Sequence, residues 1–322
     1  MKKITIFDSS YTTDNLGDQI IMRSVDAHLR EIFPQGFFTG IPSHDYPGKH
    51  GVQAAASCDL SFVGGTNILA SHWLRYHQIK LRLRDIAKIK PLILMGVGWH
   101  KYQRDPDPFT RQVHKRLFNR TFSHSARDRY TYDKLKRSGI ENVIYTACPT
   151  MWNLSPEHMG GITTKKADDV LFALTAYLRN PALDRQFIEI LIDRYREVLF
   201  WPQMYDDMAY LQEIAGEFIE AGKITVVKPS VDAVEAAFQR GNIDYIGLRL
   251  HCGVLALQNK VRSLIVVVDN RAAEISGDTG LPTIKREEFD LLNAWIDGSA
   301  PVRLNLPLDD IAAWKNQFAS HI

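Results

Sequence analysis

The sequence predicts an α/β protein made of two Rossmann-like domains, with parallel sheets and a cleft between the domains. Three observations predict this fold. Short apolar runs alternate with amphipathic helical stretches. The alternation stops at Pro149–Asp168, where prolines, paired glycines and a Thr/Lys run indicate a loop, and it then restarts. Because strictly alternating strands and helices form a parallel sheet covered on both faces, two such runs indicate two domains.

The first domain is expected to cover residues 1–155. Its strands are predicted from short apolar runs at Ile4–Phe7, Leu60–Val63, Leu92–Gly96, Phe122–Ala126 and Val143–Thr146. Its helices are predicted from apolar residues at helical spacing, at Gln19–Ile32, His72–Ile86, Phe109–Asn119 and Tyr130–Ser138. The loops after the strands are the places to search for a ligand, because ligands of open parallel sheets bind beyond the carboxyl ends of the strands.

The second domain is expected to cover residues 165–300. Its predicted strands are Val170–Thr175, Val198–Trp201, Ile224–Val227, Tyr245–Gly247, Leu264–Val268 and a weaker Leu281–Ile284. Its predicted helices are Asp184–Arg196, Met208–Glu220, Val231–Gln239 and Cys252–Gln258. A final amphipathic helix is expected at Asp309–Phe318.

The composition is that of an ordinary soluble globular protein. Of the 322 residues, 45% are hydrophobic and 24% are charged, and the formal net charge is +2. No apolar run approaches the roughly 20 residues of a membrane span, and the opening MKKITIFDSS suits a first strand better than a signal peptide. We therefore expect a cytoplasmic protein with no nucleic-acid partner and no transmembrane segment, and the sequence is compatible with a homo-oligomer.

Neither the cysteines nor the histidines are spaced as metal ligands. Cys58, Cys148 and Cys252 lie far apart, which argues against both a disulfide framework and a zinc site. The chain has no H-x-x-H or H-E-x-x-H pattern, and no G-x-G-x-x-G, G-x-S-x-G or Walker A loop. We expect no metal and no cofactor.

The loop YTTDNLGDQII joins the first strand to the first helix. Asn15, Gly17 and Asp18 suit a tight turn that leads into a helix start. Helix N-termini of this kind hold anions, so these three residues are candidate substrate ligands. The alternative is an ordinary strand-to-helix turn.

The stretch FVGGTNIL follows the second predicted strand. Gly64 and Gly65 end that strand ahead of Thr66 and Asn67, and backbone amides free of side-chain crowding can face a ligand. A similar stretch, MGVGWHKYQ, ends the next strand and carries His100. The alternative is that the glycines only let the chain turn beneath a neighbouring loop.

Arg127, in SARDRYTYDKL, stands between a short strand and a helix that Asp128 is placed to cap. A fixed guanidinium there would point into the cleft, and its planar fork suits a carboxylate or a phosphate. The alternative is a structural ion pair between Arg127 and Asp128.

The stretch IGLRLHCGVLALQNKVRS places Arg249 and His251 two apart, where a strand ends and a helix begins. The helix dipole disfavours cations at a helix N-terminus by roughly a few tenths of a kcal/mol or more, so two of them indicate an anionic ligand that offsets the cost. His251 also titrates near neutrality, as a proton donor must. The alternative is that this histidine serves packing only.

Taken together, these stretches resemble the polysaccharide pyruvyl transferase family. The segments NLGDQII, GGTNIL, ARDRYTYDKLKRSGI and GLRLHCGVLALQNKVRSLIVV occur in the family's order and at roughly its spacing. The resemblance covers about Asn15 to Arg271, and its most specific element is Arg249-Leu250-His251. It implies a two-domain fold like that of GT-B glycosyltransferases, in which the last helix, within residues 301–322, crosses back to the first domain.

The resemblance also implies the reaction and its residues. The family transfers an enolpyruvyl-derived group from phosphoenolpyruvate to sugar hydroxyls of a glycan or glycan precursor, and yields a pyruvate ketal and phosphate. Arg127, Arg249 and His251 match the family's arginine and histidine positions. Arg127 and Arg249 would hold the donor from the two domains. His251 would deliver a proton to the methylene carbon or assist the departure of phosphate.

Three positions depart from the family pattern. Cys148 precedes the proline where the family often has Asp, NKVRS stands in place of a Gly-x-Pro turn, and DNRA replaces a common Tyr and Lys, so that Arg271 substitutes there as a substrate ligand. Two other functions stay open at this point. One is a GT-B glycosyltransferase that uses a nucleotide sugar, and the other is a non-catalytic anion-binding member of the family.

Overall fold

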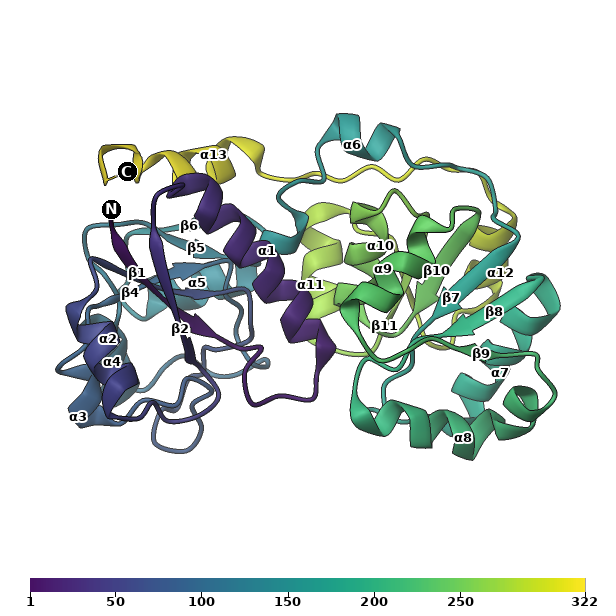
Figure 1. Cartoon of the computed structure of the whole chain (residues 1–322), viewed down its shortest axis with the longest axis horizontal. Coiled ribbons are helices and arrows are strands. Elements are labelled where there is room, and N and C mark those ends of the chain that lie inside the picture. The colour runs from purple at the N-terminus through teal and green to yellow at the C-terminus, as the bar shows by residue number, and fades with distance from the viewer. Residues whose placement is uncertain (322) are drawn as a thin grey trace. The chain divides into compact units, whose positions relative to one another are not determined.

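The computed structural model describes residues 1–321, which divide into two compact units (Figure 1). The first unit contains Met1–Thr13, Ile21–Trp152 and the chain from Leu306 onward. The second unit contains Asn153–Asn305 together with Asp14–Ile20, the segment that enters the first helix. Within the described residues, no helix is both long and apolar enough to span a bilayer.

The first unit is built on a parallel sheet in the order β2-β1-β3-β4. Its strands are β1 (Lys3–Asp8), β2 (Phe37–Pro42), β3 (Leu60–Gly64) and β4 (Leu92–Met95). Two further parallel strands, β5 (His124–Ala126) and β6 (Val143–Tyr145), pair with each other. They join the edge of β4 through the bridge from Val97 to Ala126 and a 2.9 Å hydrogen bond from Gly96 N to Ser125 O.

Helices cover both faces of this sheet (Figure 1). They are α1 (Leu16–Ile32), α2 (Lys49–Ser57), α3 (Leu83–Ile86), α4 (Pro108–Leu117), α5 (Arg129–Arg137) and α13 (Leu308–Asn316), with short 3-10 turns at Pro149–Met151 and Ala319–His321. Asp107 caps α4 and Asp128 caps α5, since each carboxylate accepts a 2.7 Å hydrogen bond from a backbone N–H of its first turn. Side chains alternate along β4, so that Leu94 enters one core cluster and Ile93 the other.

The chain from Leu306 onward returns to the first unit. In α13 and the turn after it, Ile311, Trp314 and Phe318 are buried in the cluster that also contains β1 and α1 side chains. The Trp314 indole N–H donates to Ser123 O at 2.8 Å, and the Phe318 ring meets the Phe62 ring with 5.5 Å between centroids. The final helix therefore packs on the first unit.

The second unit has one parallel sheet in the order β12-β11-β10-β7-β8-β9. Its strands are β7 (Asp169–Phe172), β8 (Glu197–Phe200), β9 (Thr225–Val226), β10 (Ile243–Gly247), β11 (Ser263–Val267) and β12 (Thr283–Lys285). The chain runs from β7 outward through β8 and β9, and then returns to the other side of β7 with β10. This is the doubly wound order, and the switch point lies between β7 and β10, where ligands of such sheets bind.

The crossovers of the second unit are helical. They are α7 (Pro181–Arg194), α8 (Tyr205–Glu220), α9 (Val231–Gln239), α10 (Leu250–Gln258) and α11 (Asn270–Thr279), with α6 (Pro156–Gly160) before the sheet and α12 (Phe289–Asp297) after it. Helix α10 approaches the sheet closely because Gly253 has no side chain. A Cβ at this position would lie 2.5 Å from Ile265 Cγ1 on β11. The small residues of the HCGVLAL stretch thus serve the packing of α10.

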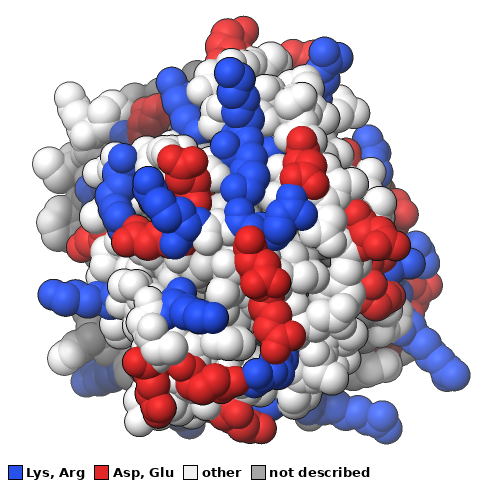
Figure 2. Space-filling model, turned by 90° about the vertical axis from the view of Figure 1, so that its right-hand side faces the viewer, with Lys and Arg blue, Asp and Glu red and all other residues white. Residues whose placement is uncertain are grey.

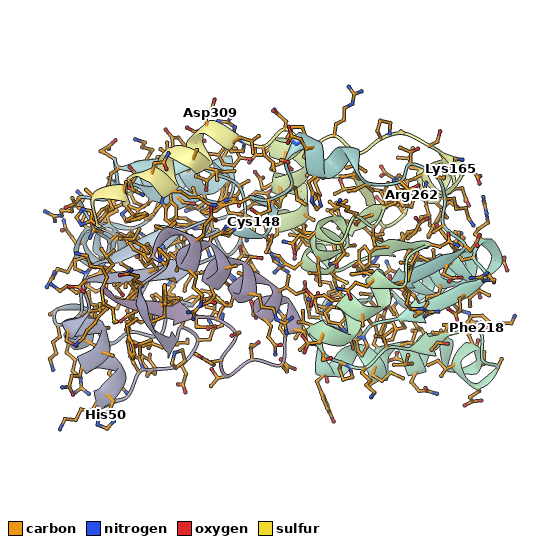
Figure 3. All side chains as sticks on the ribbon, turned by 45° about the horizontal axis from the view of Figure 1, so that its top comes forward. His50, Cys148, Lys165, Phe218, Arg262 and Asp309 are labelled. Carbon is orange, nitrogen blue, oxygen red and sulfur yellow. The ribbon has the colours of Figure 1, made fainter. Side chains whose placement is uncertain are left out.

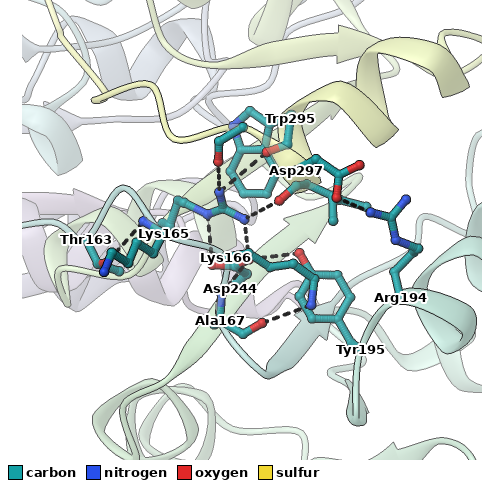
Figure 4. Close-up of polar contacts among 12 residues, drawn as sticks. Thr163, Lys165, Lys166, Ala167, Arg194, Tyr195, Asp244, Trp295 and Asp297 are labelled. Atoms are coloured by element: carbon teal, nitrogen blue, oxygen red, sulfur yellow. Dashed lines mark hydrogen bonds and ion pairs between the residues drawn. The ribbon is translucent and has the colours of Figure 1, made fainter.

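A buried network closes the amino-terminal edge of this sheet (Figure 4). Arg262, just before β11, donates to both oxygens of Asp244 on β10 at 3.1 and 2.7 Å, and the Tyr195 hydroxyl donates to Asp244 at 2.8 Å. Burial and the Asp244 charge raise the pKa of Tyr195, so the phenol stays protonated. Arg262, the last cation of the Arg-x-His stretch, therefore has a structural role at the edge opposite to the carboxyl edge.

Charged side chains of both signs are interspersed on the face of the second unit that Figure 2 shows. The second unit also has surface ion pairs such as Arg240 with Glu197, at 2.7 Å. A mixed surface of this kind gives no extended positive area for a polyanion on that face. The three cysteines are all buried and none forms a disulfide; Cys148 is labelled in Figure 3.

The structure corrects several expected elements. The predicted helix His72–Ile86 is wrong, since only Leu83–Ile86 (α3) is helical. The rest is an irregular loop, because backbone N–H groups in it donate hydrogen bonds to other parts of the chain and not along a helix. Trp73 N donates to the Thr110 hydroxyl, and Lys80 N donates to Ser43 O. Helix α10 begins at Leu250, two residues before the expected start. The elements β2, α2, α6, α11 and α12 were not expected at all.

Candidate functional site

Two loops of the second unit meet at its switch point, one after β7 and one after β10. The loop after β10 consists of Leu248 and Arg249 and leads directly into α10, in which Arg249 is the N-cap residue. The loop after β7 includes Tyr177 and ends at Asn180, which caps α7. The predicted Arg-x-His pair therefore stands at the sheet edge where a ligand is expected.

Arg249 is held in one orientation by a buried carboxylate. Its Nη2 donates to both oxygens of Asp207 at 2.5 and 2.6 Å, and its Nε donates to Leu174 O at 2.7 Å. Arg249 is 3% exposed and Asp207 is fully buried. Asp207 also accepts the backbone N–H groups of Ala176 and Met204, so its partners come from the loops after β7, β8 and β10. The pair fixes the guanidinium and keeps its charge compensated.

Tyr177 connects Arg249 to Arg271. The Arg249 guanidinium lies over the Tyr177 ring, 5.0 Å from the centroid, and Nη2 of Arg271 donates to the Tyr177 hydroxyl at 2.8 Å. Arg271 lies in the first turn of α11 and also donates to Asp269, the N-cap of that helix. Burial opposes ionisation of Asp269, but the Arg271 charge and hydrogen bonds outweigh it and lower the pKa of Asp269. The two arginines thus form one ordered group with Tyr177.

The segment Asp14–Ile20 belongs to this same unit. The Asn15 side-chain oxygen accepts the backbone N–H of Gly17 and the side-chain amide of Gln203, both at 3.0 Å, and the Asn15 amide donates to Asp18 at 3.1 Å. A Cβ on Gly17 would lie 2.7 Å from the Gln203 amide nitrogen, so a side chain at Gly17 would disturb this contact. Burial opposes protonation of Arg271, but Asp269 above all, with Tyr177 and Asp18, outweighs it and raises the pKa of Arg271.

His251 stands in the first turn of α10 and is 5% exposed. It lies two residues beyond Arg249, at the helix N-terminus and therefore at the carboxyl edge of the second sheet. The backbone there is fixed by a neighbouring hydroxyl, since Tyr245 donates to Arg249 O at 2.9 Å. The second unit therefore gathers Asn15, Gly17, Asp18, Arg249, His251 and Arg271 at one edge of one sheet.

In the first unit, Arg127 is paired with its neighbour in sequence. Its Nε and Nη2 both donate to Asp128 Oδ2 at 3.1 Å, and both residues are almost fully buried. This is the structural ion pair that the sequence leaves open as an alternative. The guanidinium lies on Gly98, where a Cβ would be 2.2 Å from Nη2 of Arg127 and 2.6 Å from the Asn67 side-chain oxygen. Arg127 and the Asn67 loop are therefore adjacent.

Gly64 and Gly65 serve close packing beneath α1. A Cβ on Gly64 would lie 2.6 Å from Val25 Cγ2, and one on Gly65 would lie 2.1 Å from Ile21 Cγ2. Gly65 also has a φ of 64°, which favours glycine. The turn that these glycines allow brings Asn67 next to Gly98. The Asn67 side-chain oxygen is buried and, within residues 1–321, accepts no hydrogen bond.

Sequence reasoning missed the residues that orient the predicted ones. Asp207 and Gln203 follow β8, Asp269 follows β11, and Tyr177 follows β7. Each lies beyond the carboxyl end of a strand, and this position could have marked it as a candidate site residue. The residues they contact could not be predicted from the sequence, because Asp207 is 42 residues from Arg249 and no local pattern links the two.

Comparison with solved structures places the fold among sugar-nucleotide epimerases. The chain matches UDP-GlcNAc 2-epimerase from Methanocaldococcus jannaschii, in complex with UDP-GlcNAc and UDP, with a TM-score of 0.55 and 13% identity over 100% of this chain and 99% of that one. It matches S. aureus MnaA with UDP at a TM-score of 0.56 and 14% identity, over 100% and 98% of the two chains. At such identities the likeness shows the fold alone, and it confirms the predicted GT-B-like fold of two Rossmann-like domains.

No curated protein matches the chain. The model of the polysaccharide pyruvyl transferase family, however, matches residues 15–270, which is most of the chain. The match spans Asn15 at its beginning, includes Arg127, Arg249 and His251, and ends at the residue before Arg271. The chain belongs to the polysaccharide pyruvyl transferase family and is a transferase.

Proposed function

We propose that the protein transfers a pyruvyl group from phosphoenolpyruvate to two hydroxyls of a sugar in a glycan or glycan precursor. The products are a pyruvate ketal and inorganic phosphate. The observation that carries the proposal is the ordered group Arg249–Tyr177–Arg271 at the switch point of the second unit, within a chain of this family. Two fixed guanidinium groups suit a donor that carries both a carboxylate and a phosphate.

The second unit is the proposed donor site. Arg249 is oriented by Asp207 and Arg271 by Asp269, so neither side chain has to be ordered when an anion arrives. Each arginine stands at the start of a helix, α10 or α11, where backbone N–H groups and the helix dipole also favour an anion. Asn15, Gly17 and Asp18 are proposed to line the same site, and Gly64, Gly65 and Arg127 to bind substrate from the first unit.

The proposed reaction balances with two sugar hydroxyls. A proton adds to the methylene carbon of phosphoenolpyruvate while the first hydroxyl oxygen bonds to the central carbon and loses its proton. The second hydroxyl oxygen then bonds to that carbon, the carbon–oxygen bond to phosphate breaks, and phosphate leaves with the electron pair and the second hydroxyl proton. His251 is the proposed donor of the first proton, because an imidazolium is acidic enough near neutral pH to protonate carbon in the transition state.

The test is a comparison of donors. The thermal unfolding midpoint of the protein should rise with phosphoenolpyruvate, because a ligand at 100 times its Kd stabilises the native state by roughly 2.7 kcal/mol. Phosphate should then be released from phosphoenolpyruvate only when a sugar acceptor from a panel is added. Stabilisation by a nucleotide sugar instead, with no phosphate release from phosphoenolpyruvate, would overturn the proposal.

A further inference from the structure

Exposed tyrosines gather at the carboxyl edges of both sheets. Within residues 1–321 every tyrosine that is exposed stands between a strand end and the next helix, or is the first residue of that helix. They are Tyr11, Tyr46, Tyr76, Tyr102, Tyr177 and Tyr205, with 39% to 84% of their surface accessible. Because these side chains are exposed, they are not needed to fill the hydrophobic core. Aromatic rings left in water at a ligand edge indicate a binding surface.

Two of these tyrosines each contact a histidine of another loop in the first unit. Tyr76 stacks on His100 with 4.4 Å between the ring centroids and an angle of 27°. The Tyr46 hydroxyl lies 3.5 Å from Nε2 of His77, the residue after Tyr76. We call Tyr46, Tyr76, His77 and His100 the aromatic platform. Its residues come from the loops after β2, β3 and β4, so three separate loops build one surface.

Contacts with buried residues and between the loops fix the platform in place. The His77 ring stacks on the buried Trp73 ring, with 4.8 Å between the centroids and an angle of 6°, and His77 Nδ1 lies 2.9 Å from Trp73 O. The loops themselves are tied together, because Leu69 and Trp99 form a parallel bridge and His100 N donates to Leu69 O at 2.8 Å. Such fixed rings lose little freedom when a ligand binds.

The chemistry of the platform differs from that of the proposed donor site. Its rings are flanked by single polar groups: Gln78 accepts a hydrogen bond from the Tyr76 hydroxyl, and the Arg82 guanidinium lies 4.7 Å from the Tyr46 ring centroid. Unlike the group of Arg249 and Arg271, it contains no pair of carboxylate-anchored arginines. A sugar ring suits this arrangement, because its C–H face packs on an aromatic ring while hydroxyls at its edge bond to polar groups.

We propose that the aromatic platform binds sugar rings of the acceptor glycan. The inference rests on the proposed function, in that it assigns the acceptor of that reaction to the first unit. The platform lies close to residues already singled out, since His100 is two residues beyond Gly98, on which Arg127 and the Asn67 side chain meet. The ligand is a neutral saccharide stretch, and the donor is bound elsewhere.

The experiment measures binding of the full chain to an array of immobilised oligosaccharides, and then the affinity for the best of them by calorimetry. Tyr76→Ala should lower that affinity about tenfold, since an aromatic contact is worth roughly 0.5–1.5 kcal/mol. Tyr76→Phe, which keeps the ring, should bind like the wild type. Phe37→Ala is the matched control, because Phe37 is 58% exposed on the same unit but begins β2, at the opposite edge of the sheet.

The results separate this proposal from the proposed function. Loss of saccharide binding in Tyr76→Ala, with unchanged thermal stabilisation by phosphoenolpyruvate, supports the platform. Saccharide binding that survives Tyr76→Ala and Tyr46→Ala, or that falls equally in Phe37→Ala, overturns it, as does a wild-type protein that binds no saccharide on the array. A third result is also informative. If phosphoenolpyruvate does not stabilise the wild type, and Tyr76→Ala loses the saccharide binding that the wild type shows, then the proposed donor is wrong but the platform is supported.

Discussion

Asp207 holds Arg249 through both of its carboxylate oxygens. Nη2 of Arg249 donates to them at 2.5 and 2.6 Å, and neither side chain has more than a few per cent of its surface exposed. Arg249, the residue proposed to bind the donor substrate, is thus also part of a buried ion pair. Orientation of the guanidinium and stability of the fold therefore depend on the same contact, and variants of either residue must be tested for both.

Asp207→Asn should destabilise the protein. The amide cannot compensate the buried charge of Arg249, and removal of one partner of a buried ion pair costs about 3–5 kcal/mol. Urea unfolding monitored by circular dichroism measures the loss. Asp206→Asn is the matched control, since Asp206 is the exposed neighbour of Asp207, and it should be nearly neutral. An Asp207→Asn protein as stable as the wild type would show that the pair contributes little.

Arg249→Lys should weaken donor binding while the fold survives. Lysine keeps a positive charge near Asp207, but it lacks the planar fork that bonds to Leu174 O and Asp207 together. Loss of one charge-assisted contact is worth roughly 1.5–3 kcal/mol, so the Kd for phosphoenolpyruvate should rise about 10- to 150-fold. Arg240→Lys, at an exposed ion pair on the amino edge of β8, should leave the Kd unchanged. Equal Kd values for both variants would remove Arg249 from the donor site.

Gly98→Ala tests whether Arg127 binds substrate. The added methyl would lie within 2.3 Å of Nη2 and Cζ of Arg127, so the guanidinium must move. Overpacking of this kind costs roughly 1–3 kcal/mol. If Arg127 contacts substrate, the KM for donor or acceptor should rise beyond that of Gly160→Ala, whose Cβ would meet nothing within 4 Å. Unchanged KM values in a folded Gly98→Ala protein would leave Arg127 with a structural role only.

The protein should lose stability as the pH falls from 6.5 toward 4. Burial lowers the pKa of His114 and of His124 to about 4, below the ordinary value near 6.5. The unfolded chain therefore takes up protons that the folded protein does not, and stability is complete above pH 6.5 and falls below it. At pH 5 each histidine should lower the free energy of unfolding by about 2 kcal/mol.

Urea unfolding at several pH values between 7.5 and 5 measures this effect. His114→Leu removes one of the two groups, so the dependence on pH should become shallower by about half of their joint contribution. The buried His28, whose pKa burial also lowers, acts in the same direction and remains in both proteins. A free energy of unfolding that stays constant from pH 7 to pH 5 contradicts the prediction.

The strands could be predicted because parallel strands are buried on both faces. Continuous apolar runs such as the one before Gly64 leave little choice of structure. β2 was missed because Phe37–Pro42 contains Gly40 and Pro42, which locally indicate a turn, whereas pairing with β1 makes it a strand. The stretch from His72 to Leu81 shows the reverse: its apolar residues are spaced as in a helix, but tertiary contacts such as Trp73 with Thr110 hold it as a loop.

The site could be predicted in position but not in its internal contacts. Arg127 and Arg249 follow strand ends, and that is visible in the sequence. The partner of Arg127 is its neighbour Asp128, so this pair was foreseen as an alternative. The partner of Arg249 comes from the first turn of α8, and the contact of Tyr177 with Arg271 joins residues that are 94 positions apart. Contacts of this kind exist only after the sheet has formed.

His251→Gln should slow the reaction without weakening the binding of phosphoenolpyruvate. If His251 delivers the proton, the chemical step should fall by roughly 10²–10⁴-fold, the usual worth of a positioned acid. The Kd for phosphoenolpyruvate should change far less, because the two arginines remain in place. Single-turnover kinetics with a confirmed acceptor measures the step. A wild-type rate in His251→Gln would leave the histidine a binding or structural residue.

The most direct test of the proposed reaction is to run it in D2O with phosphoenolpyruvate and an acceptor sugar, and to analyse the product by mass spectrometry and NMR. The account predicts that the acceptor gains one pyruvate ketal whose methyl group carries one deuterium from the solvent, with one phosphate released for each ketal. An acceptor left unmodified by phosphoenolpyruvate but glycosylated by a nucleotide sugar would contradict it.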